Sequence, residues 1–314
     1  MWKKIKKALK NPRLIGLYLL ASPLGRLISD RPFLQMKYRL SMGKKLNLDN
    51  PITYTEKLQW LKLYDRRPIY TTMVDKYAAK EYVSKVLGEE YVVKTYGVWD
   101  KFDDIDFDAL PNKFVLKCTH DSGNVVICTD KASFDVSSAK KKLCARLHVN
   151  YYYYHREWPY KNVPPRFIAE EYLEEAQDKN SIVSEYIKSP DDFKFFCFNG
   201  EPKILMIEKD RFKGSNGHTV DFFDMDFNHL EFTVDGYPNS ATPIAKPQKF
   251  DEMVRLARQL TVGIPQIRMD FYCINDKIYF GEFTFYHASG MFKPEPENWD
   301  EIMGSWIELP EKTV

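Results

Sequence analysis

The sequence predicts an α+β protein of two or three subdomains. Helical periodicity marks several segments before residue 90, a strand–loop–strand–helix–strand unit follows Pro111, and two hairpins lie in the C-terminal half. With 314 residues, 44% of them hydrophobic and 29% charged, the chain can bury a sizeable core. The formal charge of +2, without zinc-finger spacing, an RNA motif or a long basic arm, predicts no nucleic-acid partner.

The chain begins with a basic stretch and a short apolar run. Five lysines precede residue 11, and Trp2, Ile5 and Leu9 recur at helical spacing. The run LIGLYLLA falls below the roughly 18 apolar residues of a membrane span. Two interpretations stay open: a helix in peripheral contact with an anionic membrane surface, and a basic helix packed on the domain. The five cysteines include no C-x-x-C pair, so we expect a cytoplasmic protein. In the first interpretation it would lie at the inner face of the cell membrane.

Two helices and a strand are expected before the central unit. The segment 54–63 has helical periodicity, with Thr55 as a plausible cap. A second helix is expected over 73–88, ending at Gly88, and it carries Lys76 and Lys80 one turn apart. Lys80 is expected on the solvated face. A strand over 91–99 and an acidic loop follow.

The later elements follow from apolar runs and turn residues. The central unit comprises strands FVLKC and VVICT, a helix over 137–154 and the strand RFIAEEYL. Downstream, DFKFFCFNGEPKILMI predicts a hairpin turning at Asn199-Gly200. An amphipathic helix over 250–263 and a hairpin turning at Asn275-Asp276 complete the pattern.

Two carboxylates lie on the last hairpin. Asp270 ends an alternating strand and Glu282 lies near the end of its partner, so a two-residue turn would bring them side by side. Carboxylates paired across a sheet repel unless a cation lies between them. Magnesium bridging nucleotide phosphates suits this pair, because it commonly takes one or two protein carboxylates. Two independent surface acids are the alternative.

Two lysines and a small-residue loop suggest phosphate contacts. Lys117 ends a predicted strand and Lys76 lies on a predicted helix. The loop with Ser122 and Gly123 has small residues that let backbone N–H groups surround phosphate oxygens. The GxxxxGK pattern is absent. Solvated lysines and an ordinary turn would explain each feature taken alone.

The order of these features resembles the ATP-grasp enzymes, the superfamily of D-alanine–D-alanine ligase and similar carboxylate–amine ligases. FVLKCTHDSG, REWPYKN, IAEEYL, DFKFFCFNGEPK and GEFTFYHASGM are similar to the TupA-like ATP-grasp proteins of bacterial cell-envelope polysaccharide gene clusters, from about residue 50 to 300. The resemblance implies an ATP-grasp fold, in which two α+β subdomains clasp a nucleotide. Its expected parts are a basic helical segment (1–50), a helical and strand region (51–110), a small lid subdomain (111–173) and a catalytic subdomain (174–314).

The resemblance also implies ATP and Mg²⁺ as cofactors and assigns residue roles. These roles are phosphate binding by Lys76, Lys117, Ser122 and Gly123, adenine reading by Glu170, Glu171, Tyr172 and Leu173, ribose contact by Asp192, catalysis by Arg268 and Lys194, and magnesium binding by Asp270, Glu282 and Thr284. Thr284 stands where many such ligases have asparagine, and its hydroxyl can still coordinate magnesium.

The activity expected from the resemblance is ATP-dependent ligation of a carboxylate to an amine, on a small-molecule or glycan substrate of capsule, O-antigen or other cell-surface polysaccharide biosynthesis. A sugar kinase is one alternative, although no extra acid to serve as its base is evident in TFYHASGM. A glycosyltransferase is another, because Asp224–Asp226 spells a DxD motif. A non-catalytic nucleotide-binding module is the fourth.

Three histidines lack metal-ligand spacing or a nucleophile partner. His120 and His287 lie in loops expected to face the site, where substrate contact and a structural role are both open. For His155 the structural interpretation is preferred over an acceptor-binding one.

Overall fold

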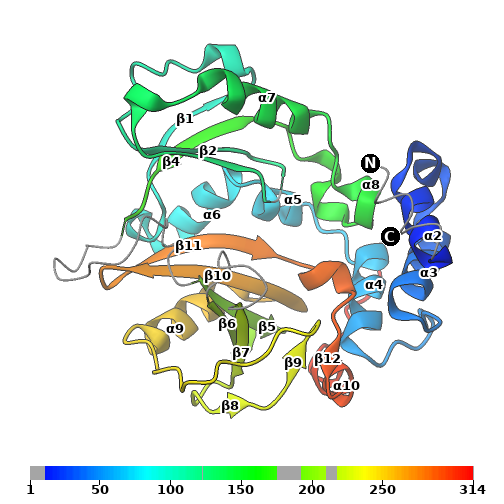
Figure 1. Ribbon diagram of the computed structural model, residues 1–314. Coiled ribbons are helices and arrows are strands. Elements are labelled where there is room, and N and C mark those ends of the chain that lie inside the picture. The colour runs from blue at the N-terminus through cyan, green and yellow to red at the C-terminus, as the bar shows by residue number, and fades with distance from the viewer. Residues whose placement is uncertain (1–10, 122, 175–191, 210–217, 314) are drawn as a thin grey trace.

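Two antiparallel sheets with surrounding helices make up the protein (Figure 1). The computed structural model describes residues 11–121, 123–174, 192–209 and 218–313. The strands are β1 (Thr95–Trp99), β2 (Phe114–Cys118), β3 (Val125–Cys128), β4 (Phe167–Glu171), β5 (Asp192–Phe198), β6 (Glu201–Lys209), β7 (Thr219–Phe223), β8 (His229–Leu230), β9 (Thr233–Val234), β10 (Gln266–Ile274), β11 (Lys277–Thr284) and β12 (Pro294–Glu295).

The helices surround both sheets. They are α2 (Pro12–Ala21), α3 (Asp30–Met42), α4 (Tyr54–Tyr64), α5 (Ile69–Val74), α6 (Ala78–Leu87), α7 (Val136–Leu147), α8 (Tyr152–His155), α9 (Phe250–Thr261) and α10 (Asn298–Ser305), with short 3-10 turns that include η5 (Trp158–Asn162) and η6 (His287–Gly290). None of the described helices is both long and apolar enough to cross a membrane. The basic residues 1–10 lie outside the described part of the chain.

Local side-chain hydrogen bonds define where several helices begin. Thr53 caps α4, because its hydroxyl accepts from the Glu56 N–H and the Glu56 carboxylate accepts from the Thr53 N–H. The expectation of Thr55 as the cap is therefore wrong. Thr55 is buried, and its hydroxyl donates to Asp300 Oδ2 at 2.8 Å.

Two helices that the periodicity predicts as continuous are broken. The segment 73–88 divides into α5 and α6, and the segment 137–154 divides into α7 and α8. At each break a short polar side chain accepts from the N–H two residues on: Asp75 from Tyr77 at 3.0 Å, and Asn150 from Tyr152 at 3.0 Å. Such local bonds compete with helix continuation.

The small sheet has the strand order β1-β4-β2-β3 and its own core. Its buried cluster draws on residues 102–169, including Phe114 and Phe167 of the sheet and Leu143 of α7. The sheet also includes β1, which lies upstream of residue 111, the expected start of this subdomain. In Figure 1 this layer, with α7 above it, lies at the top.

The large sheet has the strand order β11-β10-β5-β6-β7-β8. Both predicted hairpins are confirmed: Phe198 pairs with Glu201 and Ile274 pairs with Lys277. The turn residues have positive φ, as two-residue hairpin loops require, with Asn199 at 51° and Asn275 at 51°. The α+β fold predicted from the sequence is confirmed.

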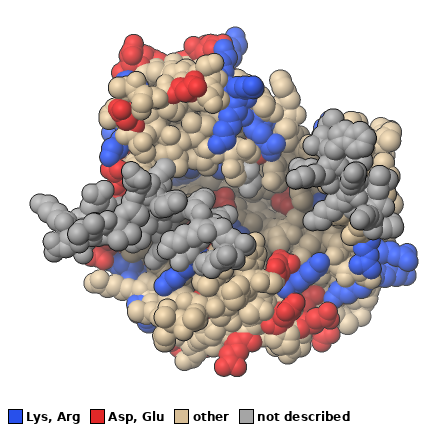
Figure 2. Space-filling view, in the orientation of Figure 1, with Lys and Arg blue, Asp and Glu red and all other residues tan. Residues whose placement is uncertain are grey.

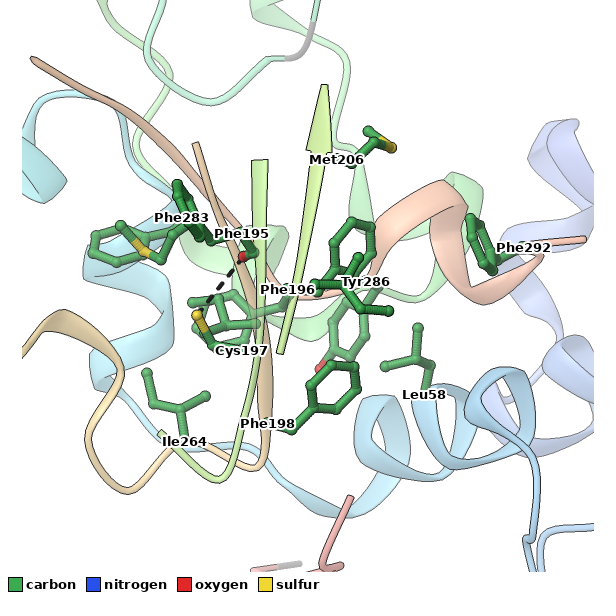
Figure 3. Packing of buried hydrophobic residues seen from close by; sticks show 14 of the residues in the cluster. Leu58, Phe195, Phe196, Cys197, Phe198, Met206, Ile264, Phe283, Tyr286 and Phe292 are labelled. Atoms are coloured by element: carbon green, nitrogen blue, oxygen red, sulfur yellow. Dashed lines mark hydrogen bonds between the residues drawn. The ribbon is translucent and has the colours of Figure 1, made fainter. Parts of the chain in front are cut away.

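One continuous core joins the large sheet to the N-terminal helices. Figure 3 shows Phe196 and Phe198 of β5 beside Leu58 of α4 and Tyr286, which follows β11. Because α3 and α4 share this core, they are fixed relative to the C-terminal end of β11, where the candidate site lies.

Candidate functional site

Strand register gathers four charged side chains on one face of the large sheet. Asp270 of β10 pairs with Glu282 of β11 on one side and with Lys194 of β5 on the other. Arg268 lies two residues before Asp270, and therefore on the same face. The expected side-by-side placement of Asp270 and Glu282 is confirmed, but the turn alone does not produce it. A β-bulge between Asp270 and Phe271 shifts the register by one residue, and without it Asp270 would lie opposite Gly281.

Arg268 is the centre of this group. Its guanidinium donates to both carboxylate oxygens of Asp270, at 2.7 and 2.5 Å, and to Glu282 Oε1 at 3.3 Å. It also contacts Nδ1 of His287 at 2.7 Å. Burial, together with the positive charges of Arg268 and Lys194, lowers the pKa of His287 well below its ordinary value. A neutral His287 accepting at Nδ1 therefore positions Arg268.

Asp270 and Glu282 place carboxylate oxygens, the ligands that a hard divalent cation prefers, on one face of the sheet, where Arg268 donates to both oxygens of Asp270. Asp270 is buried, whereas the Glu282 side chain is 43% exposed and opens toward solvent. Within the described ranges, no group of three or more His, Cys, Asp or Glu side chains is placed to hold a metal. Carboxylates plus substrate oxygens are the ligand set that magnesium commonly takes. Thr284 pairs with Arg268 across the hairpin, and its role as a ligand stays a prediction.

Lys80 and Lys117 converge on one buried carboxylate. The Lys80 ammonium lies 2.6 Å from Glu170 Oε1, and the Lys117 ammonium pairs with Oε2. Lys80 also donates to the Val93 carbonyl at 2.8 Å and to the Thr95 hydroxyl at 2.9 Å. The expectation that Lys80 lies on a solvated face is wrong, because the β1 region and β4 cover that side of α6.

Glu170 therefore serves as a counter-ion inside the small sheet. Burial raises the pKa of its carboxyl, but Lys117 and Lys80 outweigh burial, and the net pKa is lowered. Glu171, Tyr172 and Leu173 are half-buried where the chain leaves β4. Their expected contact with adenine stays a prediction, as does that of Glu170.

Lys76 lies between the two sheets. Its backbone N–H donates to the Thr119 carbonyl at 3.0 Å, just beyond β2, and its ammonium donates to the Asp121 carbonyl. Burial lowers the pKa of Lys76, and the negative charge of Glu282 opposes that shift. The charge of Glu282, on β11 of the large sheet, therefore acts on Lys76, which is bonded to the chain just beyond β2 of the small sheet. Figure 2 shows the surface hollowed between the upper lobe and the lower one, with charged atoms inside.

The loop after β2 is partly defined. Gly123 has φ of 79°, and nothing lies within 4 Å of where a Cβ would project, so this part of the loop faces open space. Ser122 lies outside the described residues. Asp192 opens β5, where it pairs with Lys194, which also approaches Asp270 Oδ2 at 3.6 Å.

His120 has a structural place. It is buried, its Nε2 lies 3.1 Å from the Arg146 carbonyl of α7, and burial lowers its pKa. Two groups that the sequence reasoning did not single out meet at the loop after β11: the Ser289 hydroxyl of that loop donates at 2.8 Å to Oε1 of Glu157, which immediately precedes η5. Glu157 belongs to the motif REWPYKN and Ser289 to the motif GEFTFYHASGM, and this membership is the sequence signal that could have singled them out.

The DxD motif is used within its own turn. Asp224 Oδ1 accepts from the N–H groups of Asp226 and Asn228, at 3.0 and 2.8 Å. Asp224 also borders a cavity of about 410 Å³, with Trp299 and Trp306 among its lining residues. None of the predicted site residues lines that cavity.

Comparison with known proteins identifies related folds. The TupA-like ATPgrasp family matches residues 56–308. Among solved structures, the D-alanine–D-alanine ligase of Helicobacter pylori is 11% identical, with 81% of this chain and 69% of that chain covered and a TM-score of 0.43. The Bacillus anthracis enzyme complexed with ATP is 12% identical, with 68% and 54% covered and a TM-score of 0.39. The ATP-grasp ligase PsnB, complexed with a minimal precursor, Mg and ADP, is 11% identical, with 81% and 62% covered and a TM-score of 0.37.

The match spans only part of those structures. This chain covers little more than half the length of the Bacillus anthracis ligase, at 54%. Comparison with curated protein sequences finds no match.

Proposed function

The chain belongs to the TupA-like ATP-grasp family, and from that membership we propose that it is an ATP-dependent ligase joining a carboxylate to an amine. One observation carries the proposal. Arg268, Asp270 and Glu282 share one face of the large sheet, and the charge of Glu282 acts on Lys76, whose ammonium donates to the Asp121 carbonyl beyond β2, so charges of both signs lie near one another. Such preorganised charge suits a reaction whose transition states carry extra negative charge.

The reaction divides into two displacements. A carboxylate oxygen attacks the γ-phosphorus of ATP, the bond to the β–γ bridging oxygen breaks, and ADP leaves. The amine nitrogen then attacks the acyl carbon of the acyl phosphate, loses a proton and expels phosphate. Positioning and charge stabilisation can supply most of the rate in such a sequence.

The chain's own residues divide this work. Lys76 and Lys117, with the loop at Ser122 and Gly123, would hold the α- and β-phosphates, and Arg268 would stabilise the tetrahedral oxyanion with its planar fork. Magnesium, held by Asp270, Glu282 and Thr284 when bound, would neutralise phosphate charge. Lys194 adds a buried positive charge beside Asp270. Within the nucleotide site, Glu171 and the Tyr172–Leu173 backbone would contact adenine, and Asp192 would accept hydrogen bonds from the ribose hydroxyls. Glu170 would hold Lys80 and Lys117 in place.

Cell-surface polysaccharide biosynthesis is the proposed setting. The family membership supports it, and the substrate would be a small molecule or a glycan that carries the carboxylate or the amine.

The test is coupled product release. Purified protein with ATP and magnesium should release ADP and phosphate only when a candidate acid and amine are both supplied, and hydroxylamine should trap the activated acid as a hydroxamate. Phosphorylated sugar without hydroxamate would refute ligation.

A sugar kinase is the second candidate, and Glu157 favours it. A kinase needs a carboxylate base near its acceptor. The structure brings Glu157 to Ser289 in the loop after β11, and burial raises the pKa of Glu157 above its ordinary value. The alternative of a glycosyltransferase is weakened, because Asp224 is engaged in its own turn.

A further inference from the structure

A second group of polar and charged side chains lies beside the loop after β11. It consists of Lys37 of α3, Lys62 of α4, His155 of α8, and Glu157 together with Ser289 of η6. The Lys62 ammonium donates to the Ser289 carbonyl at 2.8 Å and to the His155 carbonyl at 3.1 Å. We call these five residues the basic cluster.

Lys37 is bound by uncharged groups. Its ammonium donates to the Tyr154 carbonyl at 2.5 Å and lies 2.7 Å from His155 Nδ1. Burial and the positive charges of Lys37 and Lys62 lower the pKa of His155 to about 2, so the imidazole is neutral and accepts from Lys37.

The basic cluster carries more positive than negative charge. The charges that act on Lys37 are those of Lys62, Glu157 and Arg156. Arg156 pairs with Asp30 at 3.1 Å, and Asp30 also pairs with Arg66 at 2.7 Å, so Asp30 does not offset the charge of the cluster. Within the cluster, Lys37 and Lys62 are the two bases and Glu157 is the one carboxylate, and its charge acts on both lysines while it accepts from Ser289.

This imbalance is unfavourable in the absence of an anion. Burial lowers the pKa of Lys37 to about 7 and that of Lys62 to about 8. A desolvated ammonium without a matched counter-ion destabilises the fold, and a bound oxyanion removes that penalty. The cluster is suited to receive a negative charge.

The basic cluster also adjoins the face of the large sheet that carries Arg268, Asp270 and Glu282. The carboxylates of Glu157 and Glu282 both raise the pKa of Tyr160, after the larger effect of burial. Tyr160 therefore lies within the influence of both groups. The loop η6 also connects them, since it carries both His287, which contacts Arg268, and Ser289. Lys37, Tyr154 and His155 are half-buried and reach solvent, whereas Lys62 and Glu157 are buried behind them.

We propose that Lys37, with Lys62 behind it, forms a subsite for an oxyanion of the substrate, a carboxylate or a phosphate, beside the loop η6 that brings His287 to Arg268. The assignment of this anion to the substrate rests on the proposed ligase function, but anion binding itself does not. The expected substrate is acidic, with a second negative group besides the atoms that react.

The test measures the reactivity of Lys37 in the full-length wild-type protein without ATP. Limiting acetic anhydride and peptide mass spectrometry give the labelling rate of each lysine against pH, in chloride, in inorganic phosphate and in citrate. Without oxyanions, Lys37 should be half-maximally reactive near pH 7. Phosphate or citrate should slow its labelling at pH 7 by about fivefold, because a rise of about one pKa unit from 7 lowers the neutral fraction from about one half to about one eleventh. Lys113, which pairs with Glu174 at the surface, is the matched control and should not respond.

The outcomes separate the sources and the hypotheses. Protection by phosphate alone identifies a phosphate subsite, and protection by citrate alone identifies a carboxylate subsite. A Lys37 rate that neither anion changes more than that of Lys113 overturns the proposal. Glu157→Gln removes the competing carboxylate and should strengthen protection at a given anion concentration. Protection without hydroxamate formation would retain the subsite and reject the ligase.

Discussion

Glutamine in place of Glu170 should destabilise the fold more than its small change in shape suggests. The Glu170 side chain is 5% exposed, and its partners Lys80 and Lys117 are 10% and 24% exposed. Glu170→Gln removes the carboxylate that both ammonium groups contact. Breaking a buried pair in this way costs about 3–5 kcal/mol, because the remaining charge stays desolvated. Lys117 can turn toward solvent, so most of the loss should come from Lys80.

Urea unfolding at pH 7 measures this loss in the free energy of unfolding. Glu174→Gln, which affects an exposed pair with Lys113, is the control and should change stability by less than about 1 kcal/mol. Adding Lys80→Met to Glu170→Gln should restore much of the stability, since no buried ammonium then lacks its partner. A loss below about 1 kcal/mol in Glu170→Gln alone would refute the reasoning.

The same pair predicts a pH dependence with a definite sign. The folded pKa of Glu170 is lowered, since Lys117 and Lys80 outweigh burial. Its contribution is therefore present above the ordinary glutamate pKa of about 4.3, and it is lost as pH falls through the folded pKa. The stability difference between wild type and Glu170→Gln should be constant above about pH 5 and should narrow in acid. A difference that widens in acid would contradict the assignment.

Three further predictions concern the reaction. Glu282→Gln should abolish ATP turnover at an unchanged melting temperature, because losing a metal ligand removes several kcal/mol of transition-state stabilisation. Asp270→Asn should abolish turnover and also destabilise the fold, because it breaks the pair with Arg268. Unchanged ATP consumption in Glu282→Gln would reject the metal assignment. Lys117→Ala should weaken ATP binding, measured by calorimetry, by about tenfold to a hundredfold, whereas Lys113→Ala should leave it unchanged. Equal ATP affinities of the two variants would reject the phosphate contact of Lys117. Arg268→Lys should lower the rate constant of hydroxamate formation by about a hundredfold or more with little change in ATP affinity. A loss of ATP affinity alone would place Arg268 in nucleotide binding instead.

Local sequence signals predicted the hairpin of β10 and β11, which carries Arg268, Asp270 and Glu282. The two-residue turn sets the register of the first four pairs, from Ile274 with Lys277 to Phe271 with Phe280. The pairing of Asp270 with Glu282 also requires the β-bulge between Asp270 and Phe271, which spacing alone does not predict. The place of Lys80 could not, because its burial depends on β1 and β4, which arrive from elsewhere in the sequence. The contact of Glu157 with Ser289 spans 132 residues, and periodicity carries no information about such pairs.

The loop η6 shows why the N-terminal helices matter to the site. Ala288 and Ser289 have φ of 48° and 55°, a left-handed conformation that costs non-glycine residues about 1–2 kcal/mol each. Groups on α4 hold that conformation: Gln59 Nε2 donates to the Gly290 carbonyl at 2.9 Å, and Lys62 donates to the Ser289 carbonyl at 2.8 Å. The same loop presents His287 to Arg268, so the strain is stored where it positions the guanidinium. Because α3 and α4 pack in the core of the large sheet, the helices that carry Lys37 and Lys62 share one core with the strand that carries Arg268.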